Sequence, residues 1–201
     1  MKLYYARNSR AVRVAWLLEE LGLSYEIESF ELGSSDMRSD TYRALHPMGR
    51  VPTLVDGDIT LYESGAILQY LLAKYGAGRF IPDINSAAFA VNLQWFHYAE
   101  GMIMPPVNTI VVETILLPPE RRNEDNVNRA TKLLSRMLQA VDIHMEGREY
   151  IAGEFSGADI MTGHACTVSK RLGAEVSDKP NVEAFIERCN ARPALQKAWV
   201  V

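Results

Sequence analysis

The first 76 residues alternate between short apolar runs and longer runs with helical spacing. Strands are predicted where β-formers cluster or alternate with polar residues, at residues 2–6, 24–30, 53–55 and 59–62. Helices are predicted where apolar residues recur at i, i+3 and i+4, at residues 9–21, 40–45 and 64–75. The turn Asp56-Gly57-Asp58 indicates a hairpin between the last two strands. This β-α-β-α-β-β-α order predicts a mixed sheet, parallel at its start and antiparallel at the hairpin.

Beyond residue 85 the apolar spacing is helical almost throughout. Helices are predicted at residues 87–115, 120–146, 180–190 and 193–199, and Pro105-Pro106 must interrupt the first of them. Ser156 and Asp159 have the spacing of a capping box and predict another helix start, so Asp159 is expected to be structural. The chain thus predicts an α/β domain at 1–76, a linker at 77–85 that is rich in turn-forming residues, and an all-α domain at 86–201.

Composition narrows the possible functions. A hydrophobic content of 48% and a charged content of 23% are typical of an ordinary globular protein. The net charge is −4 and Lys and Arg are not clustered, which argues against nucleic-acid binding. No apolar run approaches the ~18–20 residues of a membrane span, and the N-terminus lacks a signal-like apolar stretch. Cys166 and Cys189 fit no metal or disulfide spacing, so a reduced, cytoplasmic protein without a metal is expected.

Candidate chemistry is concentrated between residues 46 and 65. Ser64 is expected at the start of a helix, where a hydroxyl and free N–H groups attract an anion, and Glu63 beside it can hold an ammonium group. The alternative is a plain helix cap with an acidic neighbour. If the Val51-Pro52 bond is cis, the backbone of Val51 is turned toward an extended peptide; the alternative is a trans proline that begins a strand.

These features resemble the cytosolic glutathione S-transferases along essentially the whole chain. The resemblance rests on the two-domain order and on four motifs: Asn8-Ser9-Arg10, His46-Pro-Met-Gly-Arg50 with Val51-Pro52, Glu63-Ser64, and Ser156 with Asp159. The first two motifs look most like bacterial and fungal members. The resemblance implies a thioredoxin-like domain that binds glutathione as co-substrate. It also implies a helical domain that lines a site for a small apolar electrophile, a homodimer, and a role in detoxification.

The resemblance assigns glutathione binding to one segment of the chain, at His46, Arg50, Val51, Pro52, Glu63 and Ser64. In the family the cysteine of glutathione pairs with the residue before a cis-proline, and the acidic-Ser pair holds the γ-glutamyl end. Arg50 is expected to reach the glycine carboxylate, although a solvated loop arginine is the alternative. His46 is equally a ligand contact or a structural loop histidine.

Activation of the glutathione sulfur requires hydrogen-bond donors, because a thiol with a pKa near ~8.5 is only a few per cent thiolate at neutral pH. The serine of several Ser-type classes falls on Ala6, which is a departure from the family pattern. Ser9 is the first candidate donor, with Asn8 or backbone amides assisting and Tyr5 third. Ser9 is otherwise a helix cap, and Tyr5 is otherwise core. No cysteine occurs in residues 1–165, which disfavours chemistry through a protein thiol.

The second substrate site is predicted from adaptable apolar side chains. Met102 and Met104 precede the proline pair and are expected to face the electrophile, with Trp199 closing the site; helix–helix core is the alternative for each. The predicted function is an enzyme, a glutathione transferase. One alternative is a glutathione-dependent peroxidase or disulfide-bond reductase on the same site. The other is a non-catalytic transferase-like module for dimerisation or regulation.

Overall fold

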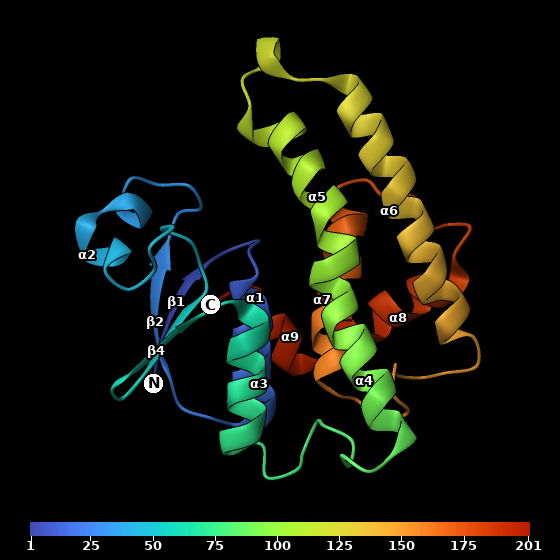
Figure 1. Cartoon of the computed structure of the whole chain (residues 1–201), viewed down its shortest axis with the longest axis horizontal. Coiled ribbons are helices and arrows are strands. Elements are labelled where there is room, and N and C mark those ends of the chain that lie inside the picture. Colours follow the sequence, from blue (N-terminus) through green and yellow to red (C-terminus); the bar gives the residue numbers. More distant parts are fainter. The chain divides into compact units, whose positions relative to one another are not determined.

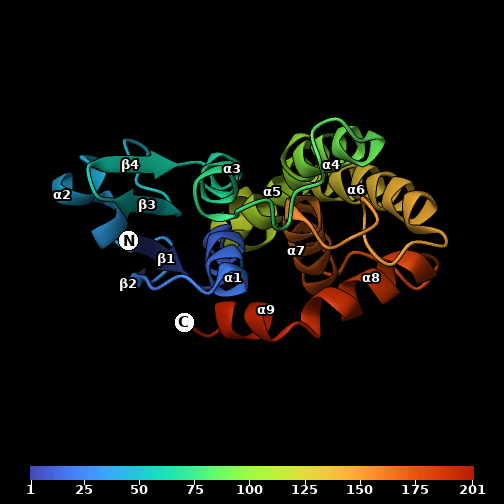
Figure 2. The ribbon, with the colours of Figure 1, turned by 90° about the horizontal axis from the view of Figure 1, so that it is seen from below.

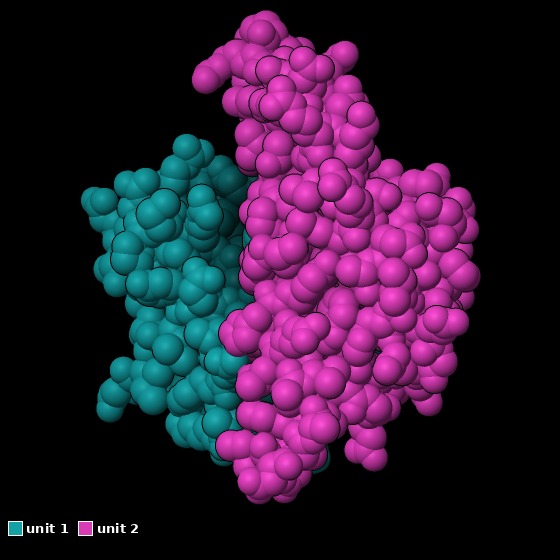
Figure 3. All heavy atoms as spheres, turned by 45° about the vertical axis from the view of Figure 1, so that its right-hand side comes forward, with its two compact units in different colours: residues 1–81, 190–201 teal, residues 82–189 magenta.

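The computed structural model describes all 201 residues and divides into two compact units, which Figure 3 shows in different colours. Unit 1 comprises residues 1–81 and 190–201, and unit 2 comprises residues 82–189. The break at residues 81–82 falls inside the predicted linker. Unit 2 ends before the predicted helical domain does, because residues 190–201 belong to unit 1.

Unit 1 is built on a four-stranded mixed sheet with the strand order β2-β1-β3-β4. Strand β1 is parallel to β2 and antiparallel to β3, and β3 forms the predicted hairpin with β4. The elements follow the predicted order: β1 (Lys2–Ala6), α1 (Ala11–Leu21), β2 (Glu26–Phe30), a 3₁₀ turn η1 (Asp36–Arg38), α2 (Asp40–Arg43), β3 (Thr53–Asp56), β4 (Ile59–Tyr62) and α3 (Ser64–Tyr75). The predicted thioredoxin-like fold is confirmed.

Helices α1 and α3 lie together on one side of the sheet, and α2 lies beyond the sheet on the other side (Figures 1 and 2). Helix α1 is buried on nearly all of its faces, including Val14, Leu18 and the large Trp16. It ends at Gly22, whose φ of 69° is left-handed and easily adopted only by a residue without a side chain. The β1–α1 and β4–α3 connections therefore carry the starts of two closely packed helices.

The C-terminal segment joins unit 1 through polar contacts that no local sequence pattern predicts. Helix α9 (Pro193–Ala198) lies beside α1 (Figure 2). The guanidinium of Arg192 donates to both carboxylate oxygens of Glu20, at 2.6 and 2.8 Å. The Lys197 ammonium pairs with Glu19 at 2.7 Å. Together with the buried Leu195 and Ala198 of α9, these ion pairs join residues 190–201 to unit 1.

Unit 2 is helical throughout, as predicted. Its elements are α4 (Ala87–Tyr98), a π-helical segment η2 (Ala99–Ile103), α5 (Met104–Val111), a π-helical segment η3 (Val112–Leu116), a 3₁₀ turn η4 (Pro119–Arg121), α6 (Glu124–Met145), α7 (Gly157–Arg171) and α8 (Pro180–Asn190). The proline pair interrupts the first long run as expected. Pro105 and Pro106 occupy the first turn of α5, directly after the π-helical η2, so the change of helix type falls where two residues offer no N–H to the preceding carbonyls.

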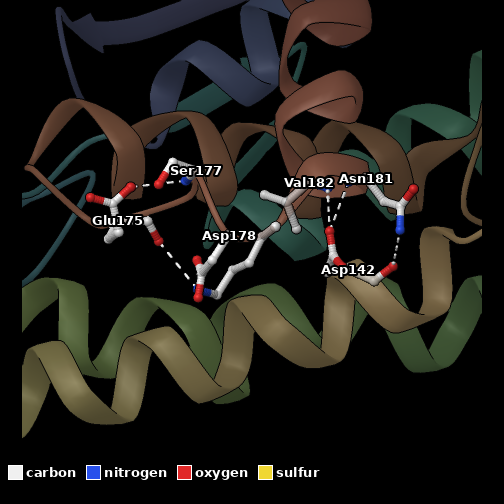
Figure 4. Close-up of polar contacts among 7 residues, drawn as sticks. Asp142, Glu175, Ser177, Asp178, Asn181 and Val182 are labelled. Atoms are coloured by element: carbon white, nitrogen blue, oxygen red, sulfur yellow. Dashed lines mark hydrogen bonds and ion pairs between the residues drawn. The ribbon is translucent and has the colours of Figure 1, made fainter.

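Two helix starts in unit 2 are closed by carboxylates. At α7 the predicted capping box is confirmed: Ser156 donates its N–H to the Asp159 carboxylate at 2.8 Å, and burial raises the pKa of Asp159 to about 6. At α8 the Asp142 carboxylate reaches across from α6 and accepts the N–H groups of Asn181 and Val182 (Figure 4). Helix α7 is buried along almost its whole length and forms the centre of the unit.

Cys166 and Cys189 are buried free thiols, and burial raises the pKa of Cys166 to about 12. Such a thiol is protonated at neutral pH and packs as a small apolar side chain. Every helix of the structure is too short or too polar to cross a membrane.

Candidate functional site

The loop that precedes β3 contains the Val51-Pro52 bond, which is cis. Tyr42 of α2 holds the residues on both sides of this bond. Its hydroxyl donates to the C=O of Arg50 at 2.5 Å and lies 3.0 Å from the hydroxyl of Thr53, the first residue of β3. Val51 itself makes no hydrogen bond through its backbone N–H or C=O within the protein. Its peptide groups are thus available to an extended ligand.

His46 and Arg50 stand at the two ends of the same loop and differ in environment. His46 is buried, its Nδ1 accepts the N–H of Met48 at 3.2 Å, and its ring lies 4.6 Å from that of Tyr62. Burial lowers the pKa of His46, so the ring is neutral at pH 7 with its proton on Nε2. These contacts match the structural alternative for His46. Arg50 is exposed, and its guanidinium is open to an anion.

The start of α3 differs from the predicted helix cap. Ser64 is the first residue of the helix rather than its cap, and no side chain caps the helix. The preceding Glu63 is exposed and has a φ of 76°, which is unusual for a residue with a side chain. Ser64 is 2% exposed, and its hydroxyl accepts a hydrogen bond at 3.2 Å from the guanidinium of Arg13 in α1.

Arg13 is the functional candidate that the sequence analysis did not single out. It is fully buried, although it lies within the apolar run Ala11-Val12-Arg13-Val14-Ala15. An arginine within an apolar run of a helix indicates a buried charge, and a buried cation needs a partner. The guanidinium adds positive charge to the already positive N-terminus of α3. Together the two favour a bound anion at Ser64.

The turn between β1 and α1 carries the candidate sulfur donors. The Ser9 hydroxyl donates to the C=O of Ala6 at 2.7 Å and accepts the N–H of Ala11 at 3.1 Å. Asn8 is exposed and left-handed, with a φ of 58°. Tyr5 is fully buried, donates its hydroxyl proton to the C=O of Ala198 at 2.9 Å, and has a pKa raised by burial. Asn8 is therefore the most accessible of the three side chains.

The three residues predicted to line the electrophile site are not alike in exposure. Met102 lies in η2 with 42% of its surface exposed, whereas Met104 begins α5 and is only 4% exposed. Both belong to unit 2, while the half-buried Trp199 follows α9 in unit 1. Of these three residues, Met102 presents the largest exposed fraction to solvent. No group of three or more His, Cys, Asp or Glu side chains has an arrangement suited to a metal ion.

Family models match both parts of the chain. The model described as "Glutathione S-transferase, N-terminal domain" matches residues 1–73, and the one described as "Glutathione S-transferase, C-terminal domain" matches residues 103–193. A maize protein named Glutathione S-transferase 3 is 32% identical over 206 residues, which cover 98% of this chain and 92% of the relative.

Solved structures from a bacterium and a fungus have the same fold. A glutathione transferase from Pseudomonas putida, solved with one glutathione disulfide bound per subunit, has a TM-score of 0.90 and 26% identity and covers 100% of this chain and 90% of its own. The transferase URE2P8 from Phanerochaete chrysosporium, solved with oxidized glutathione, has a TM-score of 0.88 and 25% identity, with coverages of 98% and 92%.

Proposed function

The chain belongs to the glutathione S-transferase family, and we propose that it is a glutathione transferase that directs the glutathione thiolate at an apolar electrophile. The observation that carries this proposal is the start of α3. Its N-terminal groups are not capped by any side chain, and the buried Arg13 guanidinium hydrogen-bonds the Ser64 hydroxyl beside them. An anionic group is the ligand that such an arrangement favours, and the γ-glutamyl carboxylate of glutathione is such a group.

The same unit provides a partner for each other part of glutathione. Glu63 is exposed next to Ser64 and is placed to hold the ammonium of the γ-glutamyl end. The free N–H and C=O of Val51, before Pro52, pair with the cysteinyl backbone as a short added strand. Exposed Arg50 binds the glycine carboxylate. His46 supports this loop from inside rather than touching the ligand.

For the sulfur we propose donors from the turn after β1. The exposed Asn8 side chain is free to donate, whereas the Ser9 hydroxyl must first leave the C=O of Ala6. The amides at the start of α1 lie in the same turn and add the positive end of the helix. Tyr5 is the weakest candidate, because its proton is held by the Ala198 carbonyl.

Within unit 2, the electrophile is proposed to meet the exposed Met102, with Met104 as a supporting apolar residue. A flexible thioether adapts to varied apolar molecules. We also infer from the family that the protein is a cytoplasmic homodimer with a role in detoxification. Light scattering of the purified protein measures its mass and so tests the homodimer.

Glutathione titration with the ultraviolet thiolate band as readout tests the proposed function. We expect the parent to bind glutathione and to lower the pKa of its thiol by at least about one unit from ~8.5. Asn8→Ala and Ser9→Ala should raise that pKa, while Tyr5→Phe should leave it unchanged. If neither Asn8→Ala nor Ser9→Ala moves the pKa, backbone amides activate the sulfur. Absence of any binding to the parent would contradict the proposal and favour the non-catalytic alternative.

A substrate panel separates conjugation from the related chemistry. Aryl halides and enals test attack on carbon, hydroperoxides test the peroxidase reaction, and mixed disulfides test the disulfide-bond reductase reaction. We expect turnover of the carbon electrophiles to dominate. Turnover confined to hydroperoxides or mixed disulfides would assign the same site to the alternative reaction.

A further inference from the structure

We propose that Tyr42 is a positioning residue for glutathione, and that its hydroxyl sets the direction of the Val51 N–H. The inference rests on the proposed function, since it concerns how the Val51 backbone recognises the cysteinyl part of the ligand. Tyr42 is buried and its hydroxyl is already engaged with the Arg50 C=O and the Thr53 hydroxyl, so we place it behind the Val51 backbone rather than against the ligand. Its hydroxyl lies between Arg50 and Thr53, which flank the Val51-Pro52 pair.

The argument depends on the planarity of the peptide group. The C=O of Arg50 and the N–H of Val51 belong to one peptide plane and point in opposite directions. A hydrogen bond of 2.5 Å from the Tyr42 hydroxyl to that C=O therefore also fixes where the Val51 N–H points. The Thr53 hydroxyl, at 3.0 Å, holds the Tyr42 oxygen from the other side of the proline.

Tyr42 is itself held on all sides, so its hydroxyl is a fixed reference point. Its ring lies 4.7 Å from that of Phe30 and 5.3 Å from that of Tyr4. Its N–H is accepted by the Ser39 hydroxyl at 3.3 Å, and its C=O accepts the N–H of His46 at 2.9 Å. Burial raises the pKa of the Tyr42 hydroxyl, so the group remains a protonated donor at neutral pH.

The loop between His46 and Arg50 is restrained at a second point besides the Tyr42 hydroxyl. Gly49 has a φ of 57°, and a Cβ placed there would lie 2.2 Å from the C=O of Met37 in η1. The loop is thus pressed against η1 at Gly49 and tied to α2 by the Tyr42 hydroxyl. The remaining freedom is rotation of the Arg50–Val51 peptide plane, which the hydroxyl bond restrains. Loss of that bond leaves the Val51 N–H to be ordered by the ligand, at a cost in affinity.

The test compares Tyr42→Phe with Tyr4→Phe. The first change removes the positioning hydroxyl and keeps the ring, while the second removes a hydroxyl from the same aromatic cluster that forms no hydrogen bond in the structure. Calorimetry uses S-methylglutathione, which has no thiol and therefore excludes effects of sulfur activation. We expect Tyr42→Phe to lower affinity about fivefold, the equivalent of one net hydrogen bond. Tyr4→Phe should bind like the parent, and both variants should keep the parent's kcat at saturating glutathione.

A ligand analogue separates positioning from general loosening of the fold. Replacing the cysteinyl carbonyl of S-methylglutathione with a thioamide weakens the acceptor that faces the Val51 N–H. The parent should discriminate against the thioamide, and Tyr42→Phe should lose most of that discrimination. Thr53→Val keeps the hydrogen bond from Tyr42 to Arg50, so its affinity and its discrimination should lie between those of the parent and Tyr42→Phe. This variant serves as the test if Tyr42→Phe does not fold.

Several outcomes would overturn the inference. Folded Tyr42→Phe that binds within twofold of the parent, or that keeps full discrimination against the thioamide, contradicts it. An equal loss of affinity in Tyr4→Phe also contradicts it. If Tyr42→Phe does not fold, a Thr53→Val variant that binds as tightly as the parent contradicts it as well. The parent titration is read separately: a parent that binds no S-methylglutathione overturns the proposed function and this inference with it.

Discussion

The N-termini of α3 and α8 show how one chain treats two similar helix ends in different ways. At α8, the Asp142 carboxylate accepts the N–H groups of Asn181 and Val182, at 2.8 and 3.1 Å. At α3, no side chain caps the helix, and the buried Arg13 guanidinium hydrogen-bonds the Ser64 hydroxyl in its first turn. A negative group stabilises a helix N-terminus, and a positive group opposes it. The end of α8 is therefore complete within the protein, while the end of α3 is suited to an anion from outside.

Helix α3 is anchored instead at its C-terminal end. The carboxylate of Asp56, at the end of β3, accepts hydrogen bonds from the hydroxyls of Tyr70 and Tyr75, at 2.7 and 2.5 Å. The ammonium of Lys74 lies 3.0 Å from the same oxygen. Because these contacts hold the far end of the helix, its first turn can remain uncapped without loss of the fold. The contacts that stabilise α3 thus lie at one end of the helix, and the proposed ligand site lies at the other.

Removing the internal carboxylate from α8 is the change with the largest expected effect on stability. Asp142→Ala should lower the free energy of unfolding by about 2 kcal/mol, since the buried N–H of Val182 and the partly buried N–H of Asn181 lose a charged acceptor. Asp142→Asn, which keeps an acceptor oxygen, should lose about half as much. Urea unfolding followed by circular dichroism measures both. Glutathione affinity of the folded variants should equal that of the parent, and a parallel loss of affinity would show that the two helix ends are not separate in role.

Local sequence patterns predicted one class of helix start and missed the other. The capping box of Ser156 and Asp159 was predictable, because its partners are three residues apart. Asp142 and Val182 are 40 residues apart, and Arg13 and Ser64 are 51 residues apart. No periodicity links such pairs, so only the tertiary structure shows that one helix end receives a carboxylate and the other an arginine.

The fold was predicted more completely than the site for the same reason. The order of strands and helices along the chain, the hairpin and the helical character of unit 2 follow from local spacing and turn residues, and the structure agrees with them. By contrast, Ser64 allowed two interpretations, a cap or a ligand contact, and the structure excludes only the first. Tyr42 gave no signal at all, because a tyrosine in a short amphipathic helix is usually core. Its role depends on Arg50 and Thr53, which lie on another segment.

Removing the Ser64 hydroxyl tests the open helix end directly. Ser64→Ala deletes a proposed ligand group and the acceptor of Arg13, so we expect glutathione affinity to fall about tenfold, equivalent to about 1.4 kcal/mol. The matched control is Ser86→Ala at α4, where the hydroxyl does cap the helix by accepting the N–H of Phe89 at 3.2 Å. That control should lose about 1 kcal/mol of stability and no affinity. Calorimetry and urea unfolding of both variants measure the contrast, and equal affinity losses would refute the special role of α3.

Acidification is the mildest test, and it examines the anchored end of α3. Hydrogen bonds from Tyr75, Tyr70 and Lys74 lower the pKa of Asp56 from 3.8 to about 2. A carboxyl with a lower pKa in the folded state stabilises the protein above the unfolded pKa, and this contribution is lost as the pH falls toward the folded pKa. Between about pH 5 and about pH 3 the advantage of the parent over Asp56→Asn should shrink by roughly 0.5–1 kcal/mol, a value reduced because half-exposed Lys74 is screened by solvent. Urea unfolding of both proteins across this range measures the difference. A gap that stays constant with pH would show that the Asp56 contacts do not anchor α3 electrostatically.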